Sequence, residues 1–385
     1  FLRSFFFIRI ISRPRNYNMS DSVLTPGQQI KPKVDEKTAI ALVEELYGFR
    51  VKEIKEFNAY DDKNYHVICE SENANPHVSE VAKDGYVLKI LNSLDSRNAS
   101  FVEGQNEMML FLDQRGVTCP VPVKNLRGSF YAVKRLGCPT NEGHVVRLLV
   151  YRPGSTLHAA PLTVGLLKDV GRFAARLGVT LAGFSHPAYE ERSSLWMLAE
   201  TPKLRDFVYA VPNEEDRKMI LRIVKCFERR VLEVADRLER RIIHGDLNEQ
   251  NILVNEEGDR VAAVIDFGDT HTACTIFELA ITVCYMIIQA RDLTMARHVI
   301  DGFQSVKKLT RLEKDILKIC VCSRICQSLT LGAYSHLNDP LNDYLLTTQK
   351  PGWEILRKLL LRIDKKSLDK IWQTVFHRIL VQKSR

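Results

Sequence analysis

The stretch "IIHGDLNEQNILV", residues 242–254, sets polar side chains between two apolar runs. His244, Asp246 and Asn251 lie within it, and the carboxylate and the carboxamide are five residues apart. A buried carboxylate without a partner costs free energy, so the segment is either a structural turn or a site of chemistry. The apolar runs predict strands that hold a short polar loop between them.

The spacing H-x-D-x-x-x-x-N in this stretch is that of a kinase catalytic loop, with Gly245 where protein kinases usually have Arg. It predicts that Asp246 orients the acceptor hydroxyl and takes its proton, and that Asn251 binds a metal ion. His244 is expected to be structural, packing against the loop and hydrogen-bonding to it.

A second motif, "AVIDFGD", follows at residues 263–269 as a β-branched run that ends in D-F-G. Asp266 is predicted to bind Mg²⁺ between the nucleotide phosphates. Either motif alone is explained by a turn-capping or strand-capping aspartate. The two motifs in this order, each beside an apolar strand, favour phosphoryl transfer from a nucleotide.

The segment "YVLKIL", residues 86–91, resembles the V-A-I-K strand that presents a lysine to the nucleotide phosphates. Lys89 is therefore a predicted nucleotide-binding residue. Its carboxylate partner is expected on the following helix, where Glu103 is preferred over Glu107. A solvated helix face is the alternative explanation for both acids.

The periodicity along the chain predicts an α+β fold with two lobes of the protein-kinase-like kind. Residues 34–148 read as a small lobe with an antiparallel sheet and helices, and residues 149–385 as a large, mainly helical lobe. Residues 1–33 read as an extension and linker. Asp35 and Gly48 are the expected N-cap and C-terminal stop of the first helix. Further helices are expected over residues 100–116, 162–183 and 214–241, and from residue 276 onward.

Composition excludes several function classes. The net charge is +8, and half of it comes from the four arginines of residues 1–18, which include no acid. No basic stripe interleaved with aromatics indicates a nucleic acid partner, and no apolar run reaches the roughly 18 residues of a membrane span. Cys320, Cys322 and Cys326 lack zinc-ligand spacing and are expected as small apolar residues of a buried helix, in a reducing compartment.

The motifs together resemble the aminoglycoside phosphotransferase family of small-molecule kinases. That family's catalytic loop typically reads H-G-D, and it carries a second aspartate after D-F-G, here Asp269. No A-P-E segment follows, so a protein-kinase activation loop is not indicated. The resemblance extends from about residue 60 to residue 335.

The closest match within that family implies transfer of the γ-phosphoryl group of GTP, or ATP, to the hydroxyl of 5-hydroxy-L-lysine in lysine-derivative catabolism. It also implies Mg²⁺ as cofactor, a nucleotide and a small-molecule substrate as partners, and a cytoplasmic location. A mitochondrial location follows instead if residues 1–18 are a genuine transit peptide. Two alternatives stay open: another acceptor (choline, ethanolamine, homoserine or an aminoglycoside), and a catalytically silent scaffold.

Substrate recognition follows from the charges of hydroxylysine, which has two ammonium groups and one carboxylate. Asp269 and Glu278 are the acids expected to bind the amines, and Arg324 the cation expected for the carboxylate. The alternative is that Glu278 and Arg324 pair with each other. Tyr334 and Trp353 are expected to line the pocket.

The turn between the first two predicted strands, "NAYDDKNYH" at residues 58–66, has no glycine to let backbone amides cover phosphates. Asp61 and Asp62 would repel phosphate if they pointed inward, so Asn64 is the expected phosphate contact.

Overall fold

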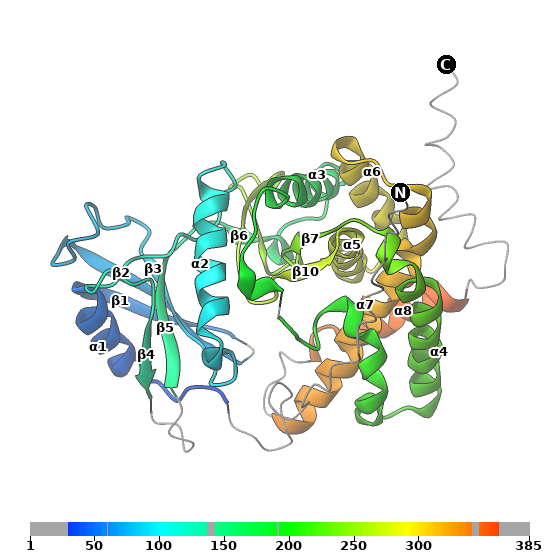
Figure 1. Cartoon of the computed structure of the whole chain (residues 1–385), viewed down its shortest axis with the longest axis horizontal. Coiled ribbons are helices and arrows are strands. Elements are labelled where there is room, and N and C mark those ends of the chain that lie inside the picture. Colours follow the sequence, from blue (N-terminus) through cyan, green and yellow to red (C-terminus); the bar gives the residue numbers. More distant parts are fainter. Residues whose placement is uncertain (1–29, 60, 137–142, 191, 341–345, 362–385) are drawn as a thin grey trace, which may run out of the picture.

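The chain folds into two lobes of unequal size, shown by a computed structural model (Figure 1). The structure describes residues 30–59, 61–136, 143–190, 192–340 and 346–361. The predicted extension and the possible transit peptide fall almost entirely outside these ranges. The architecture is α+β, with an antiparallel sheet first and a mostly helical region after it, as the periodicity predicts.

The smaller lobe is a five-stranded antiparallel sheet with strand order β1-β2-β3-β5-β4. Helix α1 (Glu36–Tyr47) precedes it, begins at Asp35, whose side chain accepts from the Thr38 amide, and ends at Gly48 with φ 67°. Both ends match the sequence prediction. The strands are β1 (Phe49–Phe57), β2 (Lys63–Asn73), β3 (Tyr86–Ile90), β4 (Ala132–Arg135) and β5 (Gly143–Val150).

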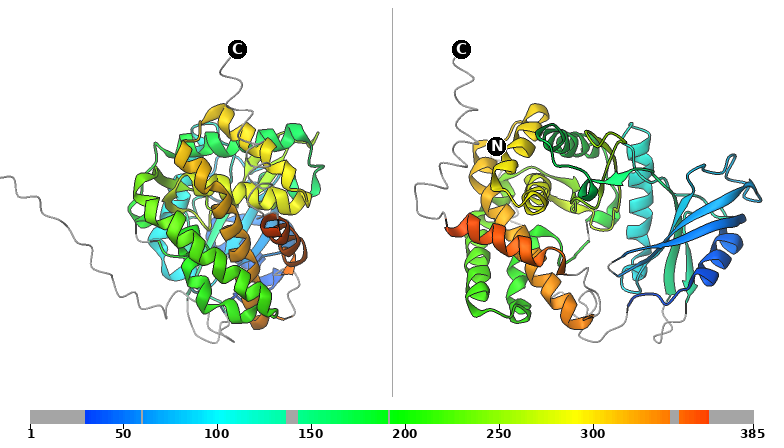
Figure 2. Two further views of the ribbon diagram at one scale, coloured as in Figure 1. Left: turned by 90° about the vertical axis from the view of Figure 1, so that its right-hand side faces the viewer. Right: turned by 180° about the vertical axis from the view of Figure 1, so that it is seen from behind.

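The register of the sheet aligns three polar residues across neighbouring strands. Asn64 on β2 is opposite Lys89 on β3, and Lys89 is opposite Arg147 on β5. Directly opposed residues project from the same face of a sheet. Helix α2 (Ala99–Asp113) stands between the sheet and the larger lobe (Figures 1 and 2). Lys89 contacts Asp266 of the larger lobe and Arg147 contacts Asn106 of α2, so the polar row faces the side of the sheet where the lobes meet.

The larger lobe surrounds short strands with helices. Its core is the larger of two main hydrophobic clusters, and the sheet of the smaller lobe has its own. The helices are α3 (Val164–Leu181), α4 (Glu214–Arg230), α5 (Ile276–Ala290), α6 (Ala296–Val306), α7 (Arg311–Asn338) and α8 (Gln349–Leu361). The strands are β6 (Ser155–Thr156), β7 (Arg240–Ile243), β8 (Ile252–Val254), β9 (Val261–Val264) and β10 (His271–Cys274).

Residues 214–241, whose amphipathic pattern predicts one helix, form three elements instead. Helix α4 ends at Arg230, a 3₁₀-helix (η7, Leu232–Arg237) follows, and β7 begins at Arg240. Pairing of β7 with β10 takes these last residues out of any helix, which is a tertiary interaction that periodicity cannot reveal. The remaining 3₁₀-helices are η2 (Asp95–Arg97), η3 (Leu157–Ala159), η4 (Pro187–Tyr189), η5 (Leu198–Asp206), η6 (Val208–Ala210) and η8 (Leu293–Met295).

Helix α7 is the one helix in the described ranges that is long and apolar enough to cross a membrane. The apolar stretch is 83% buried inside the protein, which is the behaviour of a core helix. Cys320, Cys322 and Cys326 lie on it, all buried and all with free thiols, as expected.

Candidate active site

Two loops that are distant in sequence meet at the candidate site because their flanking strands pair. Asp246 and Asn251 lie between β7 and β8, and Asp266 and Asp269 lie between β9 and β10. Strand β7 pairs with β10 and β8 pairs with β9. The Ile265 amide also donates to the Asn251 carbonyl oxygen at 2.9 Å, which joins the two loops directly.

Glu278 in the first turn of α5 holds the catalytic loop from behind. Its carboxylate accepts from the backbone amides of His244 at 2.5 Å and Gly245 at 3.2 Å. The side chain is 4% exposed, and burial raises its pKa to about 7 although the two amide donors oppose the shift. The structure thus corrects the expectation for Glu278, because its carboxylate is already occupied by the loop and not free for a substrate amine.

Gly245 is required by the shape of the loop. Its φ is +83°, and a Cβ added there would lie 2.4 Å from the carbonyl oxygen of Asp269. L-residues rarely adopt this backbone conformation, and the neighbouring atom is backbone that cannot move aside. The close approach of the two loops therefore excludes the arginine that protein kinases carry at this position.

His244 makes only structural contacts. Its Nδ1 accepts from the Asp246 amide at 3.3 Å, its Nε2 is 3.0 Å from the Ile265 carbonyl oxygen, and its ring packs on Phe267. Burial lowers its pKa, so the neutral ring bridges the two loops. These contacts fit the structural role expected from sequence.

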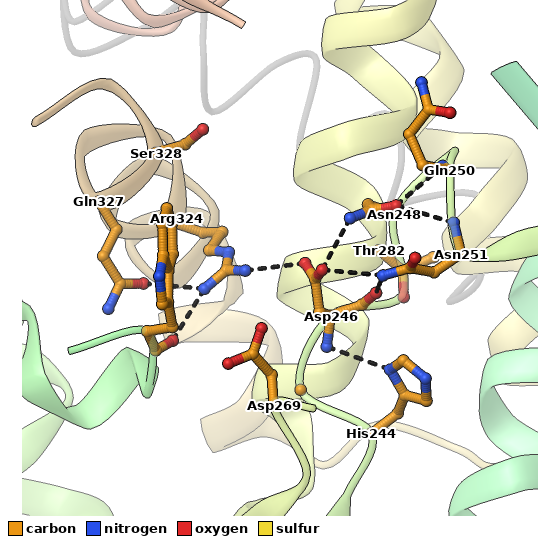
Figure 3. A network of polar contacts seen from close by, with 12 residues as sticks. His244, Asp246, Asn248, Gln250, Asn251, Asp269, Thr282, Arg324, Gln327 and Ser328 are labelled. Carbon is orange, nitrogen blue, oxygen red and sulfur yellow. Dashed lines mark hydrogen bonds and ion pairs between the residues drawn. The ribbon is translucent and has the colours of Figure 1, made fainter. Parts of the chain in front are cut away.

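Asp246 is held by three donors (Figure 3). One carboxylate oxygen accepts from Arg324 at 2.9 Å, and the other accepts from Asn248 at 2.8 Å and Asn251 at 2.9 Å. Carboxylates with several well-aligned donors are fixed in position. The side chain that is predicted to meet the acceptor hydroxyl is therefore oriented before any substrate arrives.

Arg324 reaches Asp246 from the middle of α7 and is 1% exposed. Its Nη1 donates to the Trp196 carbonyl oxygen at 2.8 Å and to the Gln327 side chain at 3.2 Å. The guanidinium also lies over the rings of Trp196 and Tyr285, 5.2 and 5.4 Å from their centroids. Burial would lower the pKa of Arg324, but surrounding acidic groups outweigh it and raise that pKa.

The alternative pairing of Arg324 with Glu278 is wrong, because each has a different partner. Arg324 pairs with Asp246, while Glu278 binds loop amides. The Nε of Arg324 is buried and has no hydrogen-bond partner among the described residues. Its predicted contact with a substrate carboxylate therefore stays a prediction.

Asp266 adopts a left-handed backbone conformation with φ 60°, which is uncommon for any residue but glycine. Its Oδ1 accepts from Lys89 and from the Gly268 amide, both at 3.2 Å. Lys89 lowers the pKa of this carboxyl below its ordinary value, against the effect of burial. The D-F-G aspartate and the strand lysine, 177 residues apart in sequence, thus meet directly, a contact that neither motif predicts.

The chemistry of Asp266 and Asn251 fits a magnesium ion. Both side chains offer oxygen ligands. The amide nitrogen of Asn251 donates its hydrogen bonds to Asp246, which leaves the amide oxygen of Asn251 available to coordinate a metal ion. The described residues contain no group of three or more His, Cys, Asp or Glu able to hold a metal. Two protein ligands suit Mg²⁺, which commonly takes its other ligands from nucleotide phosphates and water.

The expected partner of Lys89 is not found on helix α2. Glu103 is exposed and accepts from the Tyr131 hydroxyl at 3.0 Å. Lys89 instead lies 3.2 Å from Asp62, immediately before β2, as well as from Asp266. Burial opposes the charge on Lys89, yet these two carboxylates raise its pKa. Asp62 does point inward, toward a lysine.

Asn64 is the cross-strand neighbour of Lys89, as its predicted phosphate role requires. Its side-chain oxygen is buried and has no hydrogen-bond partner among the described residues. An unpaired acceptor does not by itself favour phosphate, so the role of Asn64 stays a prediction.

Asp269 directs its carboxylate toward the Arg324–Asp246 pair (Figure 3). Burial and the charge of Asp246 raise its pKa to about 7, against the opposing influence of Arg324 and Arg192. Of the two acids predicted to bind substrate amines, Asp269 is the one whose carboxylate is not occupied by loop amides.

No sequence signal indicated Arg147, Trp196 and Tyr285, because each lies outside the recognisable motifs. Asp62 was noted in its turn, but as an acid that would repel phosphate and not as a partner of Lys89. Tyr334 and Trp353, expected in the pocket, have other neighbours. Tyr334 packs edge-on against Phe207, and Trp353 donates to Gln349.

Comparison with known proteins gives the family context for this geometry. The family described as "Phosphotransferase enzyme family" matches residues 68–311. Hydroxylysine kinase of Xenopus laevis is 37% identical over 357 residues, which cover 89% of this chain and 94% of that protein. Hydroxylysine kinase of Bos taurus is 33% identical over 363 residues, which cover 90% and 95%.

A solved structure, amicoumacin kinase hAmiN in complex with AMP-PNP, Ca²⁺ and Ami, has a TM-score of 0.61 to this chain. The two are 16% identical, and the match covers 86% of this chain and 94% of that one. At this identity the similarity concerns the fold.

Proposed function

This chain belongs to the phosphotransferase enzyme family, and we propose that it transfers the γ-phosphoryl group of GTP to the hydroxyl of 5-hydroxy-L-lysine. It is a phosphotransferase with an alcohol acceptor. The observation that carries the proposal is similarity to hydroxylysine kinases over about nine tenths of the chain. The site geometry supports it, because Lys89 meets Asp266 and Asn251 meets Asp246.

In the proposed reaction, Asp246 orients the acceptor hydroxyl and receives its proton. Phosphoryl transfer asks little covalent chemistry of a protein, so positioning and charge neutralisation dominate. Lys89 contacts the nucleotide phosphates from the sheet. Asp266 and Asn251 would hold Mg²⁺, which when bound would neutralise charge that develops on the phosphates.

The acceptor is held by charge complementarity. We assign Asp269 to a substrate ammonium, since the other predicted acid, Glu278, is occupied by backbone amides. We assign Arg324 to the positioning of Asp246, through the 2.9 Å hydrogen bond between them. A rigid base beside an unpaired acid suits an acceptor that carries both a hydroxyl and an amine.

Other acceptors are less well supported. A quaternary ammonium such as choline requires an aromatic cage, and the rings of Trp196 and Tyr285 already face the guanidinium of Arg324. A catalytically silent scaffold is disfavoured because Lys89, Asp246 and Asp266 are retained and held in contact with charged or polar partners. Homoserine, with one amine and one hydroxyl, is the alternative acceptor to test.

The test is an acceptor screen with purified protein, run with GTP and with ATP in the presence of Mg²⁺. The acceptors are 5-hydroxy-L-lysine, L-homoserine, ethanolamine, choline and kanamycin, with L-lysine as the control that lacks the hydroxyl. We expect nucleotide consumption with hydroxylysine, faster with GTP, and none with lysine. Turnover of homoserine in preference to hydroxylysine would contradict the proposed substrate.

We propose a cytoplasmic location for this activity, on the basis of the resemblance drawn from sequence. The full chain and a variant that begins at Met19 should then distribute identically when each carries a C-terminal fluorescent protein. Mitochondrial accumulation of the full chain alone would identify residues 1–18 as a transit peptide.

A further inference from the structure

Lys89 has two carboxylate partners, Asp266 and Asp62, and these differ in the other hydrogen bonds that they accept. Asp266 places the same oxygen against Lys89 and the Gly268 amide, and its side chain is 46% exposed. Asp62 is 17% exposed and places one oxygen 3.2 Å from Lys89. Its other oxygen accepts from the backbone and side-chain nitrogens of Asn92 at 2.9 and 3.1 Å. Asp62 is thus anchored on the side away from the lysine.

Asp266 and Asp62 also suit different roles. Asp266 is the carboxylate that suits the metal ion, and a carboxylate oxygen that coordinates Mg²⁺ interacts less strongly with a lysine. Once the metal arrives with the nucleotide, Lys89 needs another anion to hold its buried ammonium at the phosphates. Asp62 meets this need, because its hydrogen bonds to Asn92 do not involve the metal site.

Helix α2 offers no such partner. In protein kinases a glutamate of the corresponding helix pairs with the lysine. Here α2 presents the buried Asn106 to the sheet, and its side-chain oxygen accepts from Arg147 at 3.2 Å. Arg147 is 2% exposed and stands directly opposite Lys89 in the sheet. A second buried cation therefore lies beside the lysine, and Glu103 points to solvent.

We propose that Asp62 is the positioning residue for Lys89 and replaces the helix glutamate of protein kinases. The lysine is then positioned from the start of β2. Displacement of α2, which separates the lysine from its glutamate in protein kinases, leaves the Lys89–Asp62 pair intact in this chain.

The experiment measures nucleotide affinity in four forms of the full chain: wild type, Asp62→Asn, Lys89→Met and the double variant. The ligand is GTP or ATP with Mg²⁺, whichever the wild type binds more tightly, titrated calorimetrically without an acceptor. Asparagine keeps the oxygen that accepts from Asn92 but loses the charge beside Lys89. We expect Asp62→Asn to weaken binding about tenfold, as loss of one charge-assisted contact does.

The double variant separates positioning of the lysine from a structural role of the turn. If Asp62 acts through Lys89, Asp62→Asn adds no further loss in the Lys89→Met background. Additive losses would overturn the proposal, and so would wild-type affinity in Asp62→Asn. Glu103→Gln is the matched control and should bind as the wild type does, whereas a loss there would return the role to α2.

This inference rests on the phosphotransferase activity of the family and not on the acceptor. Nucleotide binding is measured without hydroxylysine, so failure of the proposed substrate leaves the four-variant comparison unaffected. Melting temperatures of the four forms, measured without nucleotide, complete the control. A large fall for Asp62→Asn would assign Asp62 to folding and contradict the proposal.

Discussion

Two ion pairs flank the candidate site, and the protein holds them differently. Lys89 is 3.2 Å from each of its two carboxylates, and one of these, Asp266, is about half exposed. Arg324 is fully buried, lies 2.9 Å from Asp246, and is fixed by backbone, side-chain and aromatic contacts. The first pair can exchange partners, whereas breaking the second would leave a buried charge without compensation.

The difference matches what each side of the reaction requires. In the proposed reaction the phosphate side would release Asp266 to a metal ion and receive a nucleotide, and a partly exposed pair with a second carboxylate is suited to that. The hydroxyl side must hold its base still, because misplacement of a reacting group lowers the rate steeply. The following substitutions test this comparison.

The largest effect is expected from Asp246→Asn on the buried side. The carboxamide keeps the size of the side chain but cannot take the hydroxyl proton, so we expect kcat to fall about 10³-fold. Nucleotide affinity, which depends on the other pair, should change little. Steady-state kinetics and nucleotide titration measure the two quantities, and near-normal kcat would refute the assigned role.

Arg324→Gln should have the next largest effect. Loss of the guanidinium frees Asp246 on one side and leaves its charge without a cation, so kcat should fall about 10²-fold and the free energy of unfolding by about 3 kcal/mol. Arg357→Gln is the matched control, because Arg357 also pairs with a single aspartate, the buried Asp216, outside the candidate site. It should lose stability, since Asp216 is left without its cation, but no activity.

Asp269→Asn tests the acceptor side through pH. The wild-type carboxyl has a pKa of about 7, so it is increasingly protonated below pH 7 and attracts an ammonium less. The KM for hydroxylysine should therefore rise as the pH falls from 8 to 6. In Asp269→Asn it should be about tenfold higher at pH 8 and independent of pH in this range. A wild-type pH profile in the variant would exclude Asp269 from amine binding.

The raised pKa of Asp269 also affects stability. Folding disfavours its charged form, so the stability contribution of this group is full at low pH and is lost as the pH rises through about 7. Denaturant unfolding at pH 5 and pH 8 should show that Asp269→Asn is stabilised relative to wild type more at pH 8 than at pH 5.

The smallest effect is expected from Glu278→Gln, which keeps one acceptor oxygen for the loop amides. Because one acceptor oxygen replaces two, the free energy of unfolding should fall by about 1 kcal/mol. We expect kcat to fall only a few-fold. Denaturant unfolding and kinetics measure both. A rise in the KM for hydroxylysine with unchanged stability would instead return Glu278 to substrate binding.

Local sequence predicted much of the fold and several charged residues of the site, but neither of the two ion pairs. The helix from Asp35 to Gly48 follows from capping residues, and the strands follow from alternation between turn residues. Lys89 and Asp266 were predictable because each stands in a short motif with a known task. Gly245 could be noted from sequence, but the reason that a glycine is required there, the close approach of the Asp269 carbonyl oxygen, appears only in the structure.

The partners of the remaining charges were not predictable from motifs. Arg324 is 78 residues from Asp246, and Glu278 is 34 residues from His244. Glu103 is the expected partner because it lies on the helix that follows the lysine, yet the structure places Asp62, immediately before β2, beside the lysine. In each case the sequence showed that a charged residue was present, but it did not show which group that residue would contact.

The sequence by itself determined the chemistry: a lysine, two aspartates and an asparagine at kinase spacing, on elements whose periodicity and caps are local properties. The tertiary structure alone decided which charges neutralise one another. A buried charge must find a counter-charge or hydrogen-bond donors. Which one it finds depends on how α7, α5 and the sheet pack around two loops, and packing joins residues whose separation along the chain carries no signal.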